Sequence, residues 1–315
     1  MTTFPQPLTR FLLPMDIPSS FARTSWLMGT MTAALGERIE KISILHVLAG
    51  RYLSSHMANV DVRTRHVVNS ELFRKLKEQH ISNDIAPKLE EVRALLGEAG
   101  VTAPVDILIE DGEPVQRISE VAGQGYSTII MERRGLSPIK GIMVGSVAAG
   151  LLYRGIRTTV YLVGQTKKGK ACPASCCLIP VDGSVHADEA VREAAILASH
   201  CREVVKEVVL VHVLNLARYG QEEQAAVGVA AGEEIVENAC RILREGGVAA
   251  DIISRVVRYG DPGDVISEEI DKRAACMVFM GRRGRNMLGE LFMGSVSRKV
   301  IHRYPDNFVA LVSAK

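Results

Sequence analysis

The segment with the clearest chemical potential carries three glycines and a serine in the pattern Gly281-x2-Gly284-x9-Gly294-Ser295. Glycine lets the backbone approach a ligand closely, because it has no side chain in the way. The start of a helix offers unpaired N–H groups and a partial positive charge, which suit a phosphate. The hydroxyl of Ser295 and the guanidinium of Arg285 could add to such a site. The residues alone leave two alternatives open: a phosphate site, or two structural turns and a helix cap.

This glycine pattern differs from two well-known phosphate-binding motifs. No Gly-Lys-Ser/Thr follows the glycines, so the segment is not a P-loop, and its spacing is not that of the G-x-G-x-x-G dinucleotide motif. What remains is a nucleotide site without a built-in catalytic lysine. Asp182, at the end of a separate apolar run, could bind the polar edge of a ribose or a base.

The elements that would hold these residues occur twice along the chain. FLLPMD resembles CLIPVD, IIMERRG resembles VFMGRRG, and GSVAAGLLYR resembles GSVSRKVIHR. The similar segments keep the same order in both halves, which predicts a duplicated domain of ordinary size. We expect the first domain at residues 1–165 and the second at residues 172–315, joined by the polar, basic linker Gly164–Pro173.

Short apolar runs alternate with helical patterns in each copy. The expected strands of the first copy are 12–15, 42–47, 105–109, 128–131 and 159–163. Between them, apolar residues recur at helical spacing, as at Ile85, Leu89, Val92 and Leu96. Such alternation indicates a parallel sheet covered by helices on both faces. We therefore expect an α/β fold of two tandem, doubly wound, five-stranded, Rossmann-like domains, with ligands bound beyond the carboxyl ends of the strands.

Each copy ends in an apolar strand, at 159–163 or 308–312. The terminal strand of a doubly wound sheet lies at an edge, where its backbone groups lack partners. Neither strand carries a lysine, a proline or a charge that would block pairing. We therefore expect the two copies to pack as a pseudo-twofold pair with these strands at the centre of their interface. The chain could also form a homodimer.

Composition limits the class of protein. Of the 315 residues, 47% are hydrophobic and 23% charged, as in ordinary soluble globular proteins. A formal net charge of +2 supplies no basic field for nucleic acid. The longest apolar stretch, Gly141 to Tyr153, is too short to cross a bilayer, and the N-terminus lacks the pattern of a secretory signal. We expect a cytoplasmic protein with no nucleic-acid or membrane partner.

The ordered combination of Gly-x2-Gly-x9-Gly-Ser after the fourth strand, PVDGS early in the second copy and LHV in strand two resembles the universal stress protein family. The resemblance covers nearly the whole chain as two tandem domains. It implies an adenine nucleotide as ligand (ATP or AMP, with or without magnesium) and a role in stress survival and signalling. By position, Asp182 and Val213 would contact the adenosine, whereas the glycines and Ser295 would hold the phosphates. The complete expected set is Pro180, Val181, Asp182, Val213, Met280, Gly281, Gly284, Arg285, Gly294, Ser295 and Val296.

The first copy departs from this pattern, because Glu132 stands where the first glycine belongs. At ~4 Å from one phosphate charge, the repulsion is about 1 kcal/mol in water and about 4 kcal/mol at an intermediate dielectric. We expect this degenerate second site to bind nucleotide weakly or not at all, unless Glu132 swings outward. Its residues are Asp16, Glu132, Gly135, Gly145 and Ser146. By the same reasoning, Gly281→Glu should abolish nucleotide binding in the second copy and leave the fold intact.

Two repeated features admit two interpretations each. His46 and His212 hold matching places in strand two, and each could be a general base or a packed structural side chain. Arginine pairs follow strand four in both copies, at 133–134 and 282–283. Their presence in the copy with the impaired site favours a structural or surface role over phosphate binding.

Two unrepeated features also leave alternatives. The cluster of Cys172, Cys176 and Cys177 could be half of a metal site, or free thiols in a reducing compartment. The insertion Arg51–His80 could be a helical excursion that meets a partner, or a solvated loop. Neither feature identifies a ligand by itself.

Together, these observations predict an ATP- or AMP-binding stress-response regulator with one competent site, in the second copy. No catalytic residue and no metal ligand is predicted, so we expect a slow ATP hydrolase activity at most. Two rival functions stay open: an enzyme that turns over ATP, and a structural module that binds an unknown signalling protein without nucleotide. Enzymes of related fold carry HIGH or SGGxDS motifs, and the sequence contains neither.

Overall fold

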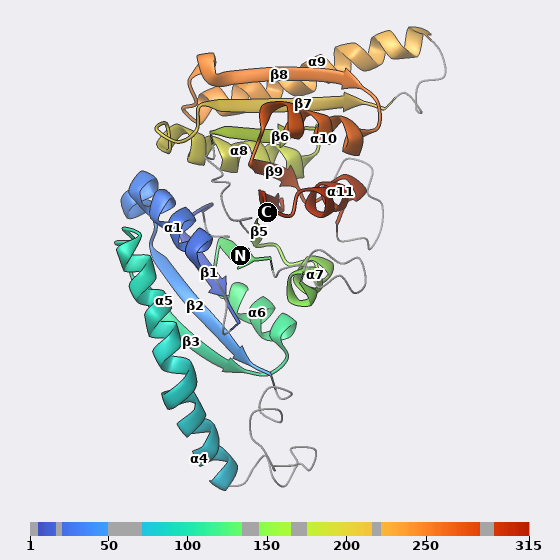
Figure 1. Cartoon of the computed structure of the whole chain (residues 1–315). Helices are drawn as coiled ribbons and strands as arrows, with labels where there is room; N and C mark the ends of the chain where they lie inside the picture. Colours follow the sequence, from blue (N-terminus) through green and yellow to red (C-terminus); the bar gives the residue numbers. More distant parts are fainter. Residues whose placement is uncertain are drawn as a thin grey trace. The chain divides into compact units, whose positions relative to one another are not determined.

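The chain forms two compact α/β units (Figure 1). One unit is Leu8–Ile130, and the other is Met131–Lys315 together with Met1–Pro7. No helix in the described part of the chain combines the length and the apolar character that crossing a membrane requires. The structure, a computed structural model, describes residues 6–16, 21–49, 71–133, 145–164, 175–215, 222–283 and 293–314.

The unit Leu8–Ile130 is built on a parallel sheet. Its strands are β1 (Arg10–Pro14), β2 (Lys41–Leu48), β3 (Val105–Asp111) and β4 (Thr128–Glu132), which continues across the division between the units. Its helices are α1 (Ala22–Leu35), the 3-10 turn η1 (Gly36–Arg38), α4 (Glu71–His80), the π-helical turn η2 (Ile81–Ile85), α5 (Ala86–Glu98) and α6 (Pro114–Ala122). The strand order is β3-β2-β1-β4, with every pairing parallel.

The unit that begins at Met131 holds the rest of the repeat. Its strands are β5 (Thr159–Val163), β6 (Cys176–Pro180), β7 (Glu207–Leu214), β8 (Ile253–Tyr259), β9 (Met277–Gly281) and β10 (Phe308–Val312). Its helices are α7 (Ser146–Tyr153), α8 (Val185–His200), α9 (Glu222–Glu245), the 3-10 turn η4 (Ala250–Ile252), α10 (Pro262–Arg273) and α11 (Ser295–Arg303). The strand order is β5-β10-β9-β6-β7-β8.

Burial explains why the strands read as near-continuous apolar runs. β2 and β7 share one burial pattern, in which only the first and seventh residues are partly exposed. The residues expected at helical spacing, Ile85, Leu89, Val92 and Leu96, are all buried along η2 and α5. In the second copy, α8 packs against α9 and α10 against α11, on opposite faces of the sheet (Figure 1). The expected α/β fold with a tandem repeat is confirmed.

The two terminal strands meet, as their apolar sequences predict. β10 pairs with β5 in the antiparallel sense, with Val309 opposite Leu162 and Leu311 opposite Val160. All residues of both strands are buried. The ring of Tyr161 lies edge-on to Phe279 of β9, with 5.9 Å between ring centroids. The pairing satisfies the backbone groups that a terminal edge strand would otherwise leave open.

Parts of two expected segments fall outside the described residues. Of the linker Gly164–Pro173, only Gly164 is described. Of the insertion Arg51–His80, the described part is α4, which runs directly into η2 and α5. That part is helical, as one of the two alternatives expects, and the partner contact of that alternative stays a prediction.

Candidate functional site

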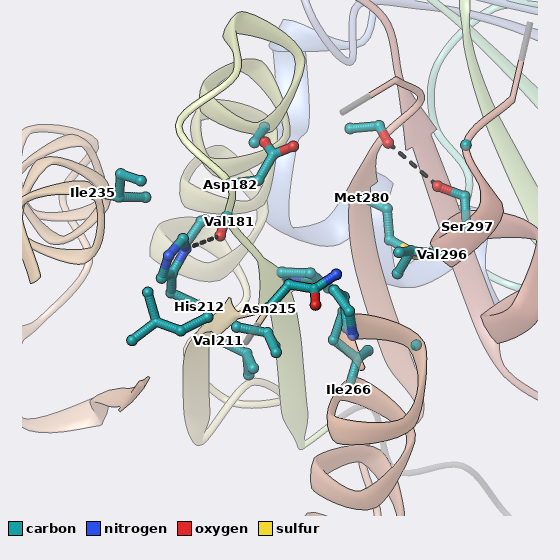
Figure 2. A pocket seen from close by; sticks show the side chains of 18 of the residues that line it. Val181, Asp182, Val211, His212, Asn215, Ile235, Ile266, Met280, Val296 and Ser297 are labelled. Carbon is teal, nitrogen blue, oxygen red and sulfur yellow. Dashed lines mark hydrogen bonds between the residues drawn. The ribbon is translucent and has the colours of Figure 1, made fainter. Parts of the chain in front are cut away.

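A cavity of about 560 Å³ lies at the carboxyl ends of β6, β7 and β9 in the second copy (Figure 2). Its volume falls within the range of about 300–1,000 Å³ that is usual for small-molecule sites. β6 pairs with β7 on one side and with β9 on the other. The chain therefore leaves β6 toward one edge of the sheet and later returns on the opposite side. Doubly wound folds bind their ligands in the crevice at such a reversal.

The expected nucleotide-binding residues that the structure describes line this one cavity. They are Pro180, Val181, Asp182, Val213, Met280, Gly281, Gly294, Ser295 and Val296. Gly284 and Arg285 lie outside the described residues. The fold thus brings together side chains from three strand ends and one helix start, which are separated by more than a hundred positions in the sequence.

The start of α11 borders the cavity with Gly294 as its N-cap residue. A glycine has no side chain to cap the helix, and the first turn of α11 carries no acidic residue. Among the described residues, a Cβ atom at Gly294 would come no closer than 3.9 Å to another heavy atom, which leaves room beside the cap on that side. Uncapped N–H groups and the positive end of the helix dipole make this terminus suitable for an anion.

Several hydrogen bonds hold the glycine segment against α11 and α8. The Ser297 hydroxyl donates to the carbonyl oxygen of Gly281 at 3.4 Å (Figure 2). The Gly294 N–H donates to the carbonyl oxygen of Arg282 at 3.2 Å. The Ser184 hydroxyl donates to the carbonyl oxygen of Arg283 at 3.4 Å. These bonds set the position of the helix start relative to the end of β9.

Asp182 follows β6 and lines the cavity. One carboxylate oxygen, Oδ1, accepts from the N–H of Ser184 at 3.1 Å. A carboxylate only accepts hydrogen bonds, so Asp182 is suited to a ligand that presents hydroxyl or amino donors, such as a ribose.

His212 also lines the cavity, with its Nδ1 2.7 Å from the carbonyl oxygen of Val181 (Figure 2). His46 repeats this contact in the first copy, with Nδ1 3.1 Å from the carbonyl oxygen of Met15. A carbonyl oxygen only accepts, so Nδ1 carries the proton in both rings. Burial lowers the pKa of His46. The geometry favours the structural interpretation of both histidines over the general-base one.

Packing by itself requires a glycine at position 281. A Cβ at this position would lie 2.8 Å from the amide nitrogen of Ala187 and 2.8 Å from the carbonyl carbon of His186, both in the first turn of α8. Backbone atoms of a capped helix cannot yield cheaply to such a contact. The expectation that Gly281→Glu would leave the fold intact is therefore wrong, because any side chain here must displace the start of α8.

The cavity has walls that the sequence pattern did not reveal. They come mainly from β7, α9, the start of α10 and α11. These residues are Ala187, Val211, His212, Leu214, Asn215, Gly228, Ala231, Gly232, Ile235, Asp261, Pro262, Gly263, Ile266, Arg283, Ser297 and Lys299. The sequence signal for these walls was the run of small residues in α9, because small side chains leave space between a helix and the sheet. Arg283 lines the cavity while Arg282 is buried, so the arginine pair divides between two environments.

A cationic side chain of α11 is tied to the start of α10 beside the cavity. The Lys299 ammonium lies 3.1 Å from Oδ1 of Asp261 and 2.7 Å from Oδ1 of Asp264. The hydrogen bonds that the ammonium donates to these two carboxylates, Asp264 first, raise the pKa of Lys299. The hydrogen bond from Lys299 lowers the pKa of Asp261. All three side chains are well exposed, so the ion pairs contribute little to stability.

The expected residues of the first-copy site fall in both units. Asp16 follows β1 and is exposed, whereas Glu132 ends β4 in the other unit. Gly145 is the N-cap of α7, again without a side-chain cap, and Ser146 opens the helix. A Cβ at Gly145 would meet no atom of the described residues within 4 Å. Gly135 lies outside the described residues. The helix start thus matches that of the second copy, and the predicted weakness of this site depends on Glu132.

The two described cysteines of the cluster are buried thiols. Cys176 and Cys177 open β6 as buried free thiols. Burial raises the pKa of Cys176 to about 12 and that of Cys177 further still, which keeps both thiols protonated and unreactive. Cys172 lies outside the described residues. In the part of the chain with described coordinates, no cluster of histidine, cysteine or carboxylate side chains is placed to bind a metal ion.

The fold is a repeated, doubly wound α/β fold with a cavity of small-molecule size at the strand reversal. These features place the chain in the class of proteins built from two tandem Rossmann-like domains. The model of the universal stress protein family matches the chain twice, at residues 30–155 and 177–308. The chain belongs to the universal stress protein family. No curated protein is similar enough in sequence to count as a relative.

Two solved structures share the fold over almost the whole chain. A universal stress protein from Archaeoglobus fulgidus DSM 4304 is 21% identical, with a TM-score of 0.66 over 98% of this chain and 97% of that one. A functionally unknown protein from Pseudomonas aeruginosa PAO1 is 15% identical, with a TM-score of 0.59 over 98% of this chain and 93% of that one. At these identities the likeness concerns the fold alone.

Proposed function

We propose that the chain binds ATP or AMP in the second-copy cavity and acts as a nucleotide-dependent regulator in a cytoplasmic stress response. The observation that carries the proposal is the uncapped start of α11, at Gly294, beside a cavity of nucleotide size. A phosphate would accept from the free N–H groups of the first helical turn. Magnesium would accompany the triphosphate if ATP is the ligand. Family membership supports the role in stress.

The adenosine part would occupy the rest of the cavity. Asp182 would accept from the ribose hydroxyls, since its carboxylate lies at the end of β6. Val213, Ile235 and Ile266 supply apolar walls for a base. Gly228 and Gly232 of α9 leave space where larger side chains would close the cavity.

We further propose one nucleotide per chain, with domains at residues 1–165 and 172–315. Glu132 would disfavour phosphate in the first copy through its side chain and its charge. The role proposed is binding rather than turnover, because the contact of His212 with Val181 recurs in the first copy, between His46 and Met15, and this gives both rings a structural use.

Mass spectrometry of small molecules released from the purified, denatured protein tests the ligand. Calorimetric titration of nucleotide-free protein with ATP and with AMP gives the stoichiometry. One tight site per chain is expected, and two equivalent sites would contradict the role given to Glu132. Absence of binding at millimolar nucleotide would leave the partner-binding module as the better function. Steady release of ADP would identify an ATP hydrolase instead.

A further inference from the structure

Two buried arginines link the copies reciprocally within the unit 131–315. Arg133 follows β4 and Arg282 follows β9, and only 3% and 2% of their surfaces are exposed. Arg282 donates to the carbonyl oxygens at the C-terminal end of α7, which are those of Leu151, Leu152 and Ile156. Arg133 donates to the carbonyl oxygens of Ile301 at 2.8 Å and Tyr304 at 3.0 Å, at the C-terminal end of α11. Each copy therefore caps the last helix of the other.

The chemistry of these contacts makes them strong and specific. The last carbonyl groups of a helix lack intrahelical partners and carry the negative end of its dipole. A guanidinium supplies several donors in a rigid planar fork, which suits a cluster of carbonyl oxygens. Burial, with a smaller contribution from Arg283, lowers the pKa of Arg282 to about 10, so the side chain stays charged at neutral pH.

The backbone of Arg282 holds the start of α11. Its N–H donates to the carbonyl oxygen of Val312 in β10 at 2.8 Å, as the Arg133 N–H donates to that of Val163 in β5 at 2.8 Å. The carbonyl oxygen of Arg282 accepts from the Gly294 N–H at 3.2 Å. Its neighbours Gly281 and Arg283 both line the cavity. One residue is thus fixed at its side chain by α7 and at its backbone by the start of α11.

We propose that Arg282 is a positioning residue for the second-copy cavity, and that α7 of the first copy is the support that holds it. Through this contact the first copy serves the nucleotide site of the second, whether or not it binds a ligand itself. Removal of the guanidinium should free the Arg282 backbone and loosen the N-cap of α11. The statement about the ligand rests on the proposed function, whereas the statement about the geometry does not.

Amide hydrogen exchange on the nucleotide-free full chain tests the geometry. Arg282→Met should accelerate exchange both at 151–156 and at 293–297. The matched control is Arg133→Met, which removes an equally buried arginine that contacts the other end of α11. The helix has nine residues, so its two ends are about 13 Å apart. Arg133→Met should accelerate exchange at 301–304 and leave 293–297 unchanged. The proposal is overturned if Arg282→Met affects 151–156 alone, because Arg282 would then be a helix cap and nothing more.

Titration with ATP tests the consequence for the site. Arg282→Met should weaken affinity by about tenfold or more, equivalent to about 1.4 kcal/mol, and Arg133→Met by less than about threefold. Arg282→Lys, which keeps the charge without the forked donors, should lie between wild type and Arg282→Met in both measurements. Equal losses of affinity in the two Met variants would mean a general loss of stability and would overturn the proposal.

Two further outcomes are distinguishable. If the wild-type chain does not bind ATP, the proposed function fails, and the exchange comparison still decides the role of Arg282. If Arg282→Met does not fold, the same comparison is made with Arg282→Lys. If amides 293–297 of Arg282→Lys exchange as slowly as those of the wild-type chain, the proposal is overturned.

Discussion

The imidazole Nδ1 of His212 lies 2.7 Å from the carbonyl oxygen of Val181, the residue directly before Asp182. The contact joins the middle of β7 to the exit of β6 and so fixes the point from which the Asp182 carboxylate enters the cavity. His46 makes the same contact to Met15, directly before Asp16, at 3.1 Å. In each copy, the histidine therefore helps to position the carboxylate that follows the first strand.

His212→Leu should weaken ATP binding by about threefold to tenfold, given about 0.5–1.5 kcal/mol for a hydrogen bond. His212→Asn should retain most of the affinity, because its amide can donate from nearly the place of Nδ1. Calorimetric titration measures both. The matched control His46→Leu should leave the affinity of the second site unchanged. Equal affinity in His212→Leu and wild type would remove the positioning role.

Gly294→Asp should abolish tight ATP binding without unfolding the protein. The described neighbours of Gly294 leave room for a side chain, and aspartate is a favourable N-cap. Its carboxylate would take the N–H groups of the first helical turn and repel phosphate. Gly145→Asp makes the same change at the start of α7, where no atom of the described chain would lie within 4 Å of the added Cβ, and serves as the control. If the two variants bind ATP equally well, phosphate does not sit at the start of α11.

Gly281→Ala should lower the free energy of unfolding by about 1–3 kcal/mol, the usual cost of overpacking. The cause is the 2.8 Å approach of the added Cβ to the backbone of Ala187. Urea denaturation measures the change, and Gly294→Ala should shift the midpoint much less. Wild-type stability in Gly281→Ala would show that α8 yields easily at its first turn.

Acidification should destabilise the protein through His186. Its Nδ1 accepts the Ala314 N–H at 2.7 Å, which only the neutral ring can do. Burial, then Arg283 and Arg282, lowers the pKa of His186 in the fold. The unfolded state then binds the proton more readily, so stability falls as the pH drops below about 6.5. Urea unfolding over a pH series should show a shallower decline for His186→Gln, and an identical slope would exclude this contribution.

Val309→Lys should destabilise the chain strongly and promote aggregation. Val309 is fully buried between Leu162 of β5 and Val278 of β9. A lysine there must either bury an ammonium or separate the strands, and open strand edges associate. Size-exclusion chromatography and thermal unfolding reveal both effects. Val257→Lys, at an exposed position of β8, should behave like wild type.

Much of the fold and of the candidate site can be predicted from local sequence patterns. Apolar strands that alternate with amphipathic helices dictate a parallel sheet with covered faces, and two similar halves dictate a repeat. In such a fold, the loops after the strands gather at one edge of the sheet. For that reason Asp182, Gly281 and Gly294 could be assigned to one site without knowledge of any contact between them.

Only the tertiary structure decided how the glycines and arginines are used. Gly281 is glycine because α8 approaches it, and Arg282 is buried because α7 ends beside it. Small residues of α9 open the cavity only because that helix lies over β7. These contacts join segments far apart in the sequence, and they depend on how side chains fill the space between elements. Periodicity reports which face of an element is buried, but it contains no information about which distant segment buries it.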